Sequence, residues 1–395
     1  MKKNTLVMKI DEESMLIRVV CLLILGLYIR NASYVLSIFS ANTKQIIYIL
    51  IKGVILVAII ACVPVIIHRL SVGFTIVVIC SVLFILLHIL LFEDNNKIFL
   101  DTVNTFVTTI LPGVICVYFI RDYVGLFNKF IIVATIISLI NIGVFVLLVA
   151  GMFSAEGYSM GFSQSLIFPT NILIANLYDK QTVKISSICL IILNALTIIL
   201  FGSRGALVAI FVFLILMNIK NIHQNKKTII YKIIMMVLAM LLVILFFNTI
   251  IGGLINCFER LGISSRSLEL ILQHDFFSNN GRIDIWKTIW SELSKHPFQI
   301  RGINADQLLR TGFYNTSNYS HNIFLELLYS FGIVFGGGLS IVFGTCFYKT
   351  YVGNIASKEQ MLKILLLSPF FPLCIWSGSL WTDMYCWLWL ALKKK

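Results

Sequence analysis

The chain carries little charge for its length. Only 12% of its 395 residues are Asp, Glu, Lys or Arg, while 59% are hydrophobic. A soluble protein of this size carries about 25% charged residues, so a water-soluble fold is excluded. The apolar runs are continuous and about 20 residues long, which is the length of an α-helix that crosses a bilayer. The sequence therefore predicts an all-α polytopic membrane protein rather than a β-barrel, whose strands are short and alternate in hydrophobicity.

Several other signals are also absent. The polar residues 1–13 are not followed by a short apolar core with a small-residue cleavage site, so no cleaved signal peptide is expected. Eight of the nine cysteines fall inside apolar runs and only Cys257 lies near a loop, so no disulfide framework is expected. No metal-ligand spacing and no phosphate-binding glycine loop is found. The chain is therefore expected to need no cofactor and to act on an already activated donor.

Twelve apolar runs are interpreted as spans. They cover residues 16–39, 46–67, 72–92, 99–120, 130–150, 160–178, 185–201, 206–219, 229–250, 323–348, 362–376 and 380–392. The sixth is weak, because Gln164, Pro169, Asn171 and Asn176 interrupt it. No internal repeat separates these runs, and no soluble domain is evident.

The basic residues predict the orientation of the spans. The formal charge of +13 is better explained by cytoplasmic anchoring than by nucleic-acid binding, because Lys and Arg accumulate on the inner side of membrane proteins. With the N-terminus inside, 19 Lys and Arg residues fall at inner span ends and five at outer ones. Both termini are therefore expected in the cytoplasm, and the long polar loop on the external side.

That loop divides the chain into three parts. Residues 1–250 hold nine spans, residues 251–320 form the external loop, and residues 321–395 hold three more spans. Within the loop Ile283, Trp286, Ile289, Trp290 and Leu293 recur at helical spacing, which predicts an amphipathic helix over 283–293 that ends at His296-Pro297. Residues 268–277 are a second candidate. Such a helix either lies in the membrane interface or packs on the top of the bundle.

Arginines at the external side are the first candidate binding residues. Arg204 lies in the four-residue turn Gly202-Ser203-Arg204-Gly205 between two spans, where a guanidinium can bind phosphate with two parallel hydrogen bonds. Its alternative role is to reach the lipid headgroups. Arg282 directly precedes the amphipathic helix. Together with the other loop arginines it forms a basic surface suited to a pyrophosphate or an acidic sugar. Six acids in the same loop leave its net charge at about +1. The other arginines are Arg260, Arg266, Arg301 and Arg310.

His321 is the candidate base. It stands where the loop returns to the membrane, and histidine changes charge near neutral pH. A capping or interfacial histidine is the alternative. Asn322 and Glu326 follow on one helix face, and an intramembrane carboxylate points to function by default. Glu326 could orient His321 or bind an arginine, and Asp383 holds a similar place at the outer end of the last span. Asn322, Glu326 and Asp383 are therefore candidate substrate-binding residues, together with the loop arginines.

The ordered motifs resemble one family. Gly202-Ser203-Arg204-Gly205, Asn280-Gly281-Arg282 with Trp286, Gly302, and His321-Asn322 occur in that order. Together with the twelve spans and the long late loop, this order resembles the bacterial O-antigen polymerase/O-antigen ligase family, and most of all a Wzy-type polysaccharide polymerase. The resemblance covers about residues 200–340 in motifs and the whole chain in topology.

The resemblance implies a metal-independent glycosyltransferase in the bacterial cytoplasmic membrane. Its substrate would be an undecaprenyl-diphosphate-linked oligosaccharide at the external face. Arg204 and Arg282 would hold the diphosphate, and His321 would act as base or position the acceptor hydroxyl. A chain-length regulator, a flippase and membrane lipid are the implied partners. A glycan ligase of the same family, a flippase for the same lipid and a small-solute transporter are the alternatives.

Overall fold

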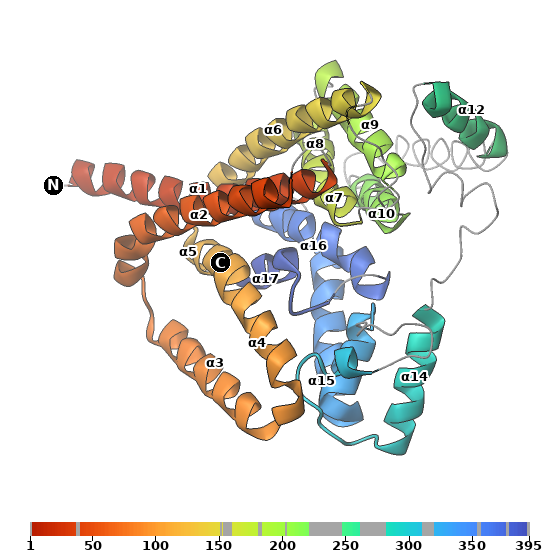
Figure 1. The fold of residues 1–395 in the computed structure, drawn as a ribbon. Helices are drawn as coiled ribbons and strands as arrows, with labels where there is room; N and C mark the ends of the chain where they lie inside the picture. Colours follow the sequence, from red (N-terminus) through yellow and green to blue (C-terminus); the bar gives the residue numbers. More distant parts are fainter. Residues whose placement is uncertain are drawn as a thin grey trace.

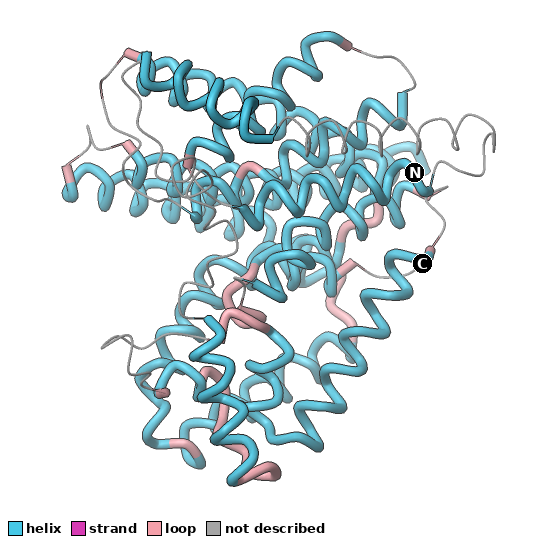
Figure 2. Tube along the Cα trace, turned by 90° about the vertical axis from the view of Figure 1, so that its right-hand side faces the viewer, coloured by secondary structure: helices cyan, strands magenta, loops and turns pink. Residues whose placement is uncertain are grey.

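The structure is a computed structural model. It describes residues 2–36, 40–150, 152, 160–180, 184–201, 204–220, 247–260, 282–309, 320–353, 357–376 and 379–392. Every regular element within these residues is a helix and none is a strand, which confirms the all-helical class. Helices α1, α2, α6, α8, α9 and α10 occupy the upper part of Figure 1, and α3, α4, α14 and α15 occupy the lower part. Figure 2 shows the same two groups after a rotation of 90°.

The first half of the chain follows the predicted spans. Its long helices are α1 (Lys2–Val35), α2 (Ala41–His68), α3 (Val72–Leu91) and α6 (Tyr123–Val149). Ser40 and Ser71 begin α2 and α3, because their hydroxyls accept the N–H groups of Thr43 and Phe74.

Two predicted spans are interrupted by proline. The fourth consists of η1 (Glu93–Asn95), α4 (Asn96–Thr105), the π-helical turn η2 (Phe106–Ile110) and α5 (Leu111–Phe119), with Pro112 at the start of α5. The sixth consists of α7 (Met160–Ser165) and α8 (Ile167–Lys180). Pro169 has no N–H to donate to the carbonyl of Ser165 four residues earlier, and its ring crowds that carbonyl, so α7 ends there.

The second half contains α9 (Ile185–Leu200), α10 (Arg204–Lys220), α12 (Phe247–Arg260), α14 (Arg282–Lys295), η5 (Ala305–Leu308), α15 (Ile323–Val352), α16 (Lys358–Trp376) and α17 (Met384–Ala391). Residues 229–246 of the ninth predicted span lie outside the described residues. The twelfth predicted span begins later than expected. Residues 380–382 form a turn, and the Asp383 carboxylate starts α17 by accepting the Cys386 N–H at 2.9 Å.

Within the part of the chain that the structure describes, six helical segments are long and apolar enough to cross a membrane. They are Glu12–Val35, Ala41–His68, Val72–Leu91, Glu93–Phe119, Tyr123–Val149 and Ile323–Val352. Ile185–Leu200 and Gly205–Asn218 are shorter apolar helices. These helices support a membrane protein, while the number of twelve spans and their external loop stay predictions.

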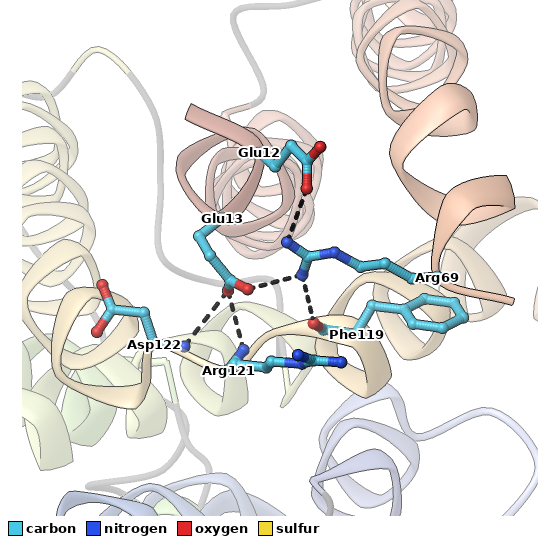
Figure 3. A network of polar contacts seen from close by, with 6 residues as sticks. All are labelled: Glu12, Glu13, Arg69, Phe119, Arg121 and Asp122. Carbon is cyan, nitrogen blue, oxygen red and sulfur yellow. Dashed lines mark hydrogen bonds and ion pairs between the residues drawn. The ribbon is translucent and has the colours of Figure 1, made fainter. Parts of the chain in front are cut away.

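A cluster of charges joins the early part of α1 to two helix junctions, which follow α2 and α5 at one end of these helices (Figure 3). The Arg69 guanidinium contacts Glu13 at 2.6 Å and Glu12 at 3.0 Å, and it donates to the Phe119 carbonyl at 2.9 Å. The other Glu13 oxygen accepts the backbone N–H groups of Arg121 and Asp122. The end of α2, the link from α5 to α6 and the early part of α1 therefore meet here.

A second set of contacts extends the same end to α8, α10 and α16. Lys358 begins α16, forms an ion pair with Asp179 of α8, and lies 4.4 Å from the centre of the Phe127 ring of α6. The Tyr178 hydroxyl donates to Asn218 in the last turn of α10 at 2.8 Å. Both α8 and α10 thus end where α16 begins. Because α10 packs along α16, the two helices are antiparallel.

Two apolar clusters hold the helices together. The larger joins α1, α2, α5, α6, α8, α9, α10 and the helices from α15 to α17. The smaller joins Ile285, Ile289 and Leu293 of α14 to Ala305 and to Leu325 and Tyr329 of α15. The helix predicted over 283–293 is confirmed as α14, and it packs against α15.

The buried face of α14 differs in part from the predicted one. Residues 285, 289 and 293 repeat every four positions and face α15, with Trp286 packed beside them. Ile283 and Trp290 lie on another face and are 43% and 49% exposed. The second candidate helix, 268–277, lies outside the described residues, and the division of the chain at residues 250 and 320 stays a prediction.

Candidate functional site

The first turns of α14 and α15 bring Arg282 and His321 together. Arg282 begins α14, and His321 precedes α15 by two residues. Trp286, one turn after Arg282, donates its indole N–H to the Ser320 carbonyl at 2.8 Å, which holds α14 beside the 320–322 segment. Burial and, to a smaller extent, the positive charge of Arg282 together lower the pKa of His321 to about 4. The imidazole is therefore neutral at pH 7 and lies within the field of the guanidinium.

His321 has a backbone conformation that is uncommon for residues other than glycine. Its φ is 53°, in the left-handed region. Strained backbone of this kind persists where surrounding contacts hold it, and it clusters at functional sites. The neighbours on both sides supply such contacts, because Ser320 is bound to Asp306 and Asn322 caps α15.

Asn322 is the N-cap of α15. Its side-chain oxygen accepts the N–H groups of Phe324 at 3.0 Å and Leu325 at 3.2 Å. This bond fixes the start of the helix beside His321. A role for Asn322 in binding substrate stays a prediction.

Glu326 lies one turn into α15 and is 1% exposed. The Ser379 hydroxyl donates to one carboxylate oxygen at 2.6 Å, and the Leu380 N–H donates to the other at 3.1 Å. The hydrogen-bond partners found for Glu326 are thus in the segment after α16, rather than His321 or an arginine. Glu326 links the start of α15 to the end of α16.

Asp306 was not singled out from the sequence, where it was only one of six acids in the loop. It lies in η5, is 1% exposed, and accepts the Ser320 N–H through Oδ2 at 2.6 Å. Burial raises the pKa of Asp306 above its ordinary value, and the hydrogen bonds from Ser320 oppose that rise. It also interacts electrostatically with Glu326. Two buried carboxyl groups therefore lie close enough to interact, and one of them is bound to the residue before His321.

Arg301, a predicted substrate ligand, is engaged within the protein. Its guanidinium donates to the Glu292 and His296 carbonyls at 3.3 Å, and it lies 4.5 Å from the Tyr329 ring centre. The Glu292 carbonyl in the last turn of α14 also accepts the His296 N–H at 3.3 Å, so Arg301 adds a further hydrogen bond at that helix end. Its role in binding substrate stays a prediction.

The remaining arginines are placed only in part. Arg204 begins α10, and its side chain lies outside the described residues. Since α10 runs antiparallel to α16, the Arg204 backbone lies toward the end of α16, which is followed by the Glu326 partner Ser379. Arg260 ends α12 and is exposed. Arg266 and Arg310 lie outside the described residues.

Asp383 has a local structural role. Its carboxylate caps α17, as described above, and its predicted contact with substrate stays a prediction. Among the residues that the structure describes, no group of three or more His, Cys, Asp and Glu side chains could hold a metal ion.

The fold and these residues define a helical membrane protein with a polar site where α14 meets α15. The family model described as O-Antigen ligase matches residues 189–339. This range contains Arg204, Arg282, Asp306, His321 and Glu326, and the match confirms the resemblance to the O-antigen polymerase/O-antigen ligase family. No curated protein and no solved structure matches the chain.

Proposed function

We propose that this chain is a glycosyltransferase that polymerises lipid-diphosphate-linked oligosaccharides. The donor is an undecaprenyl-diphosphate-linked repeat unit, and the reaction takes place at the external face of the bacterial cytoplasmic membrane with both termini of the chain inside. The observation that carries the proposal is the juxtaposition of Arg282 and His321 where α14 meets α15. The family match over the same residues supports it.

The reaction forms one bond and breaks another. The oxygen of an acceptor hydroxyl attacks the anomeric carbon of the donor, and the bond from that carbon to the diphosphate breaks with its electron pair on the leaving oxygen. His321 takes the proton of the hydroxyl. Arg282, with Arg204 as the second cation, stabilises the charge on the departing lipid diphosphate. Preorganised groups of this kind contribute roughly 3–4 kcal/mol each.

The charges at the site favour proton uptake by His321 after the donor has bound. Neutral His321 can accept a proton, but a pKa of about 4 makes it a weak base. A diphosphate bound beside Arg282 offsets the positive charge that lowers this pKa. Donor binding therefore raises the basicity of His321, so the base becomes effective once the donor is in place.

The experiment uses the purified chain in lipid vesicles with a synthetic lipid-diphosphate-linked oligosaccharide. Arg282→Ala is expected to lower the rate of transfer by about 10²–10³-fold, and His321→Ala by about 10²–10⁴-fold. Lys287→Ala is the matched control, because Lys287 is an exposed cation on the same helix, and it should retain the wild-type rate. Wild-type rates in both Arg282→Ala and His321→Ala would remove the proposed mechanism.

Ligation is the second candidate, and the description of the matching family favours it. A polymerase joins repeat units to each other and gives a ladder of lipid-linked multiples. A ligase moves a glycan once to a different acceptor and leaves the donor chain length unchanged. The product pattern with donor alone, and with donor plus a second acceptor, distinguishes the two. In cells, loss of a polymerase leaves single units on the lipid, whereas loss of a ligase leaves long lipid-linked chains.

A further inference from the structure

Ser320, the residue before His321, is bound by three different segments. Its N–H donates to Asp306 Oδ2 at 2.6 Å, and its carbonyl accepts the Trp286 indole N–H at 2.8 Å. Its hydroxyl donates to the Asn322 carbonyl at 3.0 Å. Ser320 is 1% exposed, and its bond to Asp306 is buried. The backbone that enters His321 is therefore fixed from η5, from α14 and from the start of α15.

Asp306 is itself anchored from another part of the chain. Its segment follows Gly302, whose φ is 87°, and begins after Asn304, whose φ is 59°. The Ile303 N–H donates to Nε2 of His88 in α3 at 2.9 Å, and the Asn304 amide donates to the Thr102 hydroxyl of α4. A Cβ added at Gly302 would lie 2.7 Å from His88 Nε2. Helices α3 and α4 thus hold the Asp306 carboxylate in place independently of His321.

We propose that Asp306 is a positioning residue for His321. By accepting the Ser320 N–H, Asp306 keeps the backbone of His321 in the left-handed conformation, and this conformation holds the imidazole beside Arg282. This inference rests on the proposed function, because it assigns Asp306 the role of positioning the proposed base, His321. Asp306 touches Ser320 and not the reacting atoms, and its bond spans 14 residues of sequence. The segment between them, 310–319, lies outside the described residues and takes no part in the proposal.

Asp306 positions His321 through its hydrogen bond to Ser320 rather than through its charge. The groups with which the structure shows electrostatic interaction are Glu326 and Tyr329 of α15. A negative charge at 306 is opposed by Glu326, whereas an uncharged acceptor at the same place would hold Ser320 equally well. Asparagine provides such an acceptor through its side-chain oxygen. Asp306→Asn is therefore expected to preserve the role, and Asp306→Ala to remove it.

The test measures the position of His321 without relying on activity. The full chain in vesicles is treated with diethylpyrocarbonate, and the modified fraction of His321 is measured by peptide mass spectrometry. His296 is the internal reference, because it is exposed in the same loop. In Asp306→Ala the ratio of His321 to His296 modification should rise several-fold, and in Asp306→Asn it should stay within about twofold of wild type. Glu259→Gln, which removes an exposed acid of α12, is the control and should leave the ratio unchanged.

Transfer kinetics complete the test. Misplacing a reacting group by about 1 Å costs about 10²-fold in rate, so kcat of Asp306→Ala should fall by about that factor while the donor KM changes little. Asp306→Asn should restore kcat to within about tenfold of wild type. Asp306→Leu, which fills the space without an acceptor, replaces Asp306→Ala if that variant does not fold, and the same changes are expected.

The outcomes separate the two proposals. An unchanged His321 ratio in folded Asp306→Ala or Asp306→Leu overturns the positioning role, whatever the activity. Full activity of His321→Ala, or no sugar transfer by the wild-type chain, overturns the proposed function, and the labelling ratio still decides the positioning role. The positioning role is also overturned if the labelling ratio rises in Asp306→Ala and stays raised in Asp306→Asn. The hydrogen bond to Ser320 would then not be what keeps His321 in place.

Discussion

At the residue scale, His321 shows how one cation sets the state of a base. Burial and the charge of Arg282 both disfavour the imidazolium, so its pKa is about 4 instead of its ordinary 6.5. As the pH falls, His321 is protonated in the unfolded chain before it is protonated in the folded chain. His321 therefore does not change the folding stability above pH 6.5, and it lowers the stability as the pH drops from 6.5 toward 4.

This balance predicts the effect of removing the cation. In Arg282→Gln the pKa of His321 should rise toward its ordinary value, although burial will keep it below 6.5. The midpoint of diethylpyrocarbonate modification of His321 against pH measures this change, because only the neutral imidazole reacts. Lys287→Gln, an exposed cation on the same helix, should leave the midpoint in place. An equal midpoint in wild type and Arg282→Gln would show that the two groups do not interact.

Arg301 is a second residue whose role its contacts decide. We expect Arg301→Ala to lower the free energy of unfolding by about 2–3 kcal/mol, since it removes the hydrogen bonds to the carbonyls of α14 and the contact with the Tyr329 ring. Arg301→Lys keeps the charge without the planar fork and should lose a smaller part. Chemical unfolding in detergent measures both.

The same two variants test substrate binding by Arg301. If Arg301 serves the fold, the donor KM per folded molecule should stay within about twofold of wild type. A much higher KM in folded Arg301→Lys would instead support the predicted contact with substrate.

At the element scale, the main feature is a break in α15. Gly332 has φ 72° and ψ 171° inside the helix, so the backbone groups around it lose their helical partners. The loop after α14 replaces them. Ser330 O accepts the N–H groups of Arg301 and Gly302, and Ile333 N–H donates to Pro297 O at 2.8 Å. The backbone groups freed by the break and those of the loop thus provide each other's hydrogen-bond partners.

Substitutions at two glycines of α15 should have opposite effects. Gly332→Ala places a side chain at positive φ, and its Cβ would lie 3.0 Å from the Phe298 backbone. We expect a loss of about 2 kcal/mol or more in stability. Gly338→Ala is the matched control, because a Cβ there meets nothing within 4 Å, and helix propensity should make it neutral or stabilising by up to about 1 kcal/mol. Thermal unfolding in detergent compares them, and equal stability of the two variants would contradict a structural role for the break.

At the scale of the whole molecule, charged contacts gather at one end. The Arg69 cluster, shown in Figure 3, and the Lys358 contacts collect helix ends from α2, α5, α6, α8, α10 and α16 beside the early part of α1. Their cations Arg69, Arg121 and Lys358 all belong to the set that the sequence assigns to the cytoplasmic side. The candidate site at α14 and α15 is built from other helix ends, which fits a reaction on the opposite face.

This arrangement predicts the accessibility of single cysteines in a chain whose native cysteines are replaced. Lys287→Cys on α14 should react with a membrane-impermeant maleimide added outside intact cells. Val124→Cys, exposed in the first turn of α6, should react only after the membrane is opened. Labelling of both positions from outside would contradict the proposed sidedness.

Local pattern allowed some of these features to be predicted. The apolar periodicity located α2, α3 and α6 to within several residues, and the helix from 283 to 293 with its stop at Pro297. The proline interruptions and the break at Gly332 were not predicted in their observed form, because apolar composition continues through them. The predicted apolar face of α14 was right for Trp286, Ile289 and Leu293, but it missed Ile285 and wrongly included Ile283 and Trp290.

The sequence by itself determined the class of the protein and the identity of Arg282 and His321 as candidates, because hydrophobicity and residue chemistry are local properties. Tertiary structure decided what surrounds them. Asp306 reaches Ser320 across 14 residues, Ser379 reaches Glu326 across 53, and His88 reaches Ile303 across 215. No periodicity encodes such pairs, since they depend on how separate helices pack. Only the packing could show that an acid of the loop supports the backbone of the proposed base.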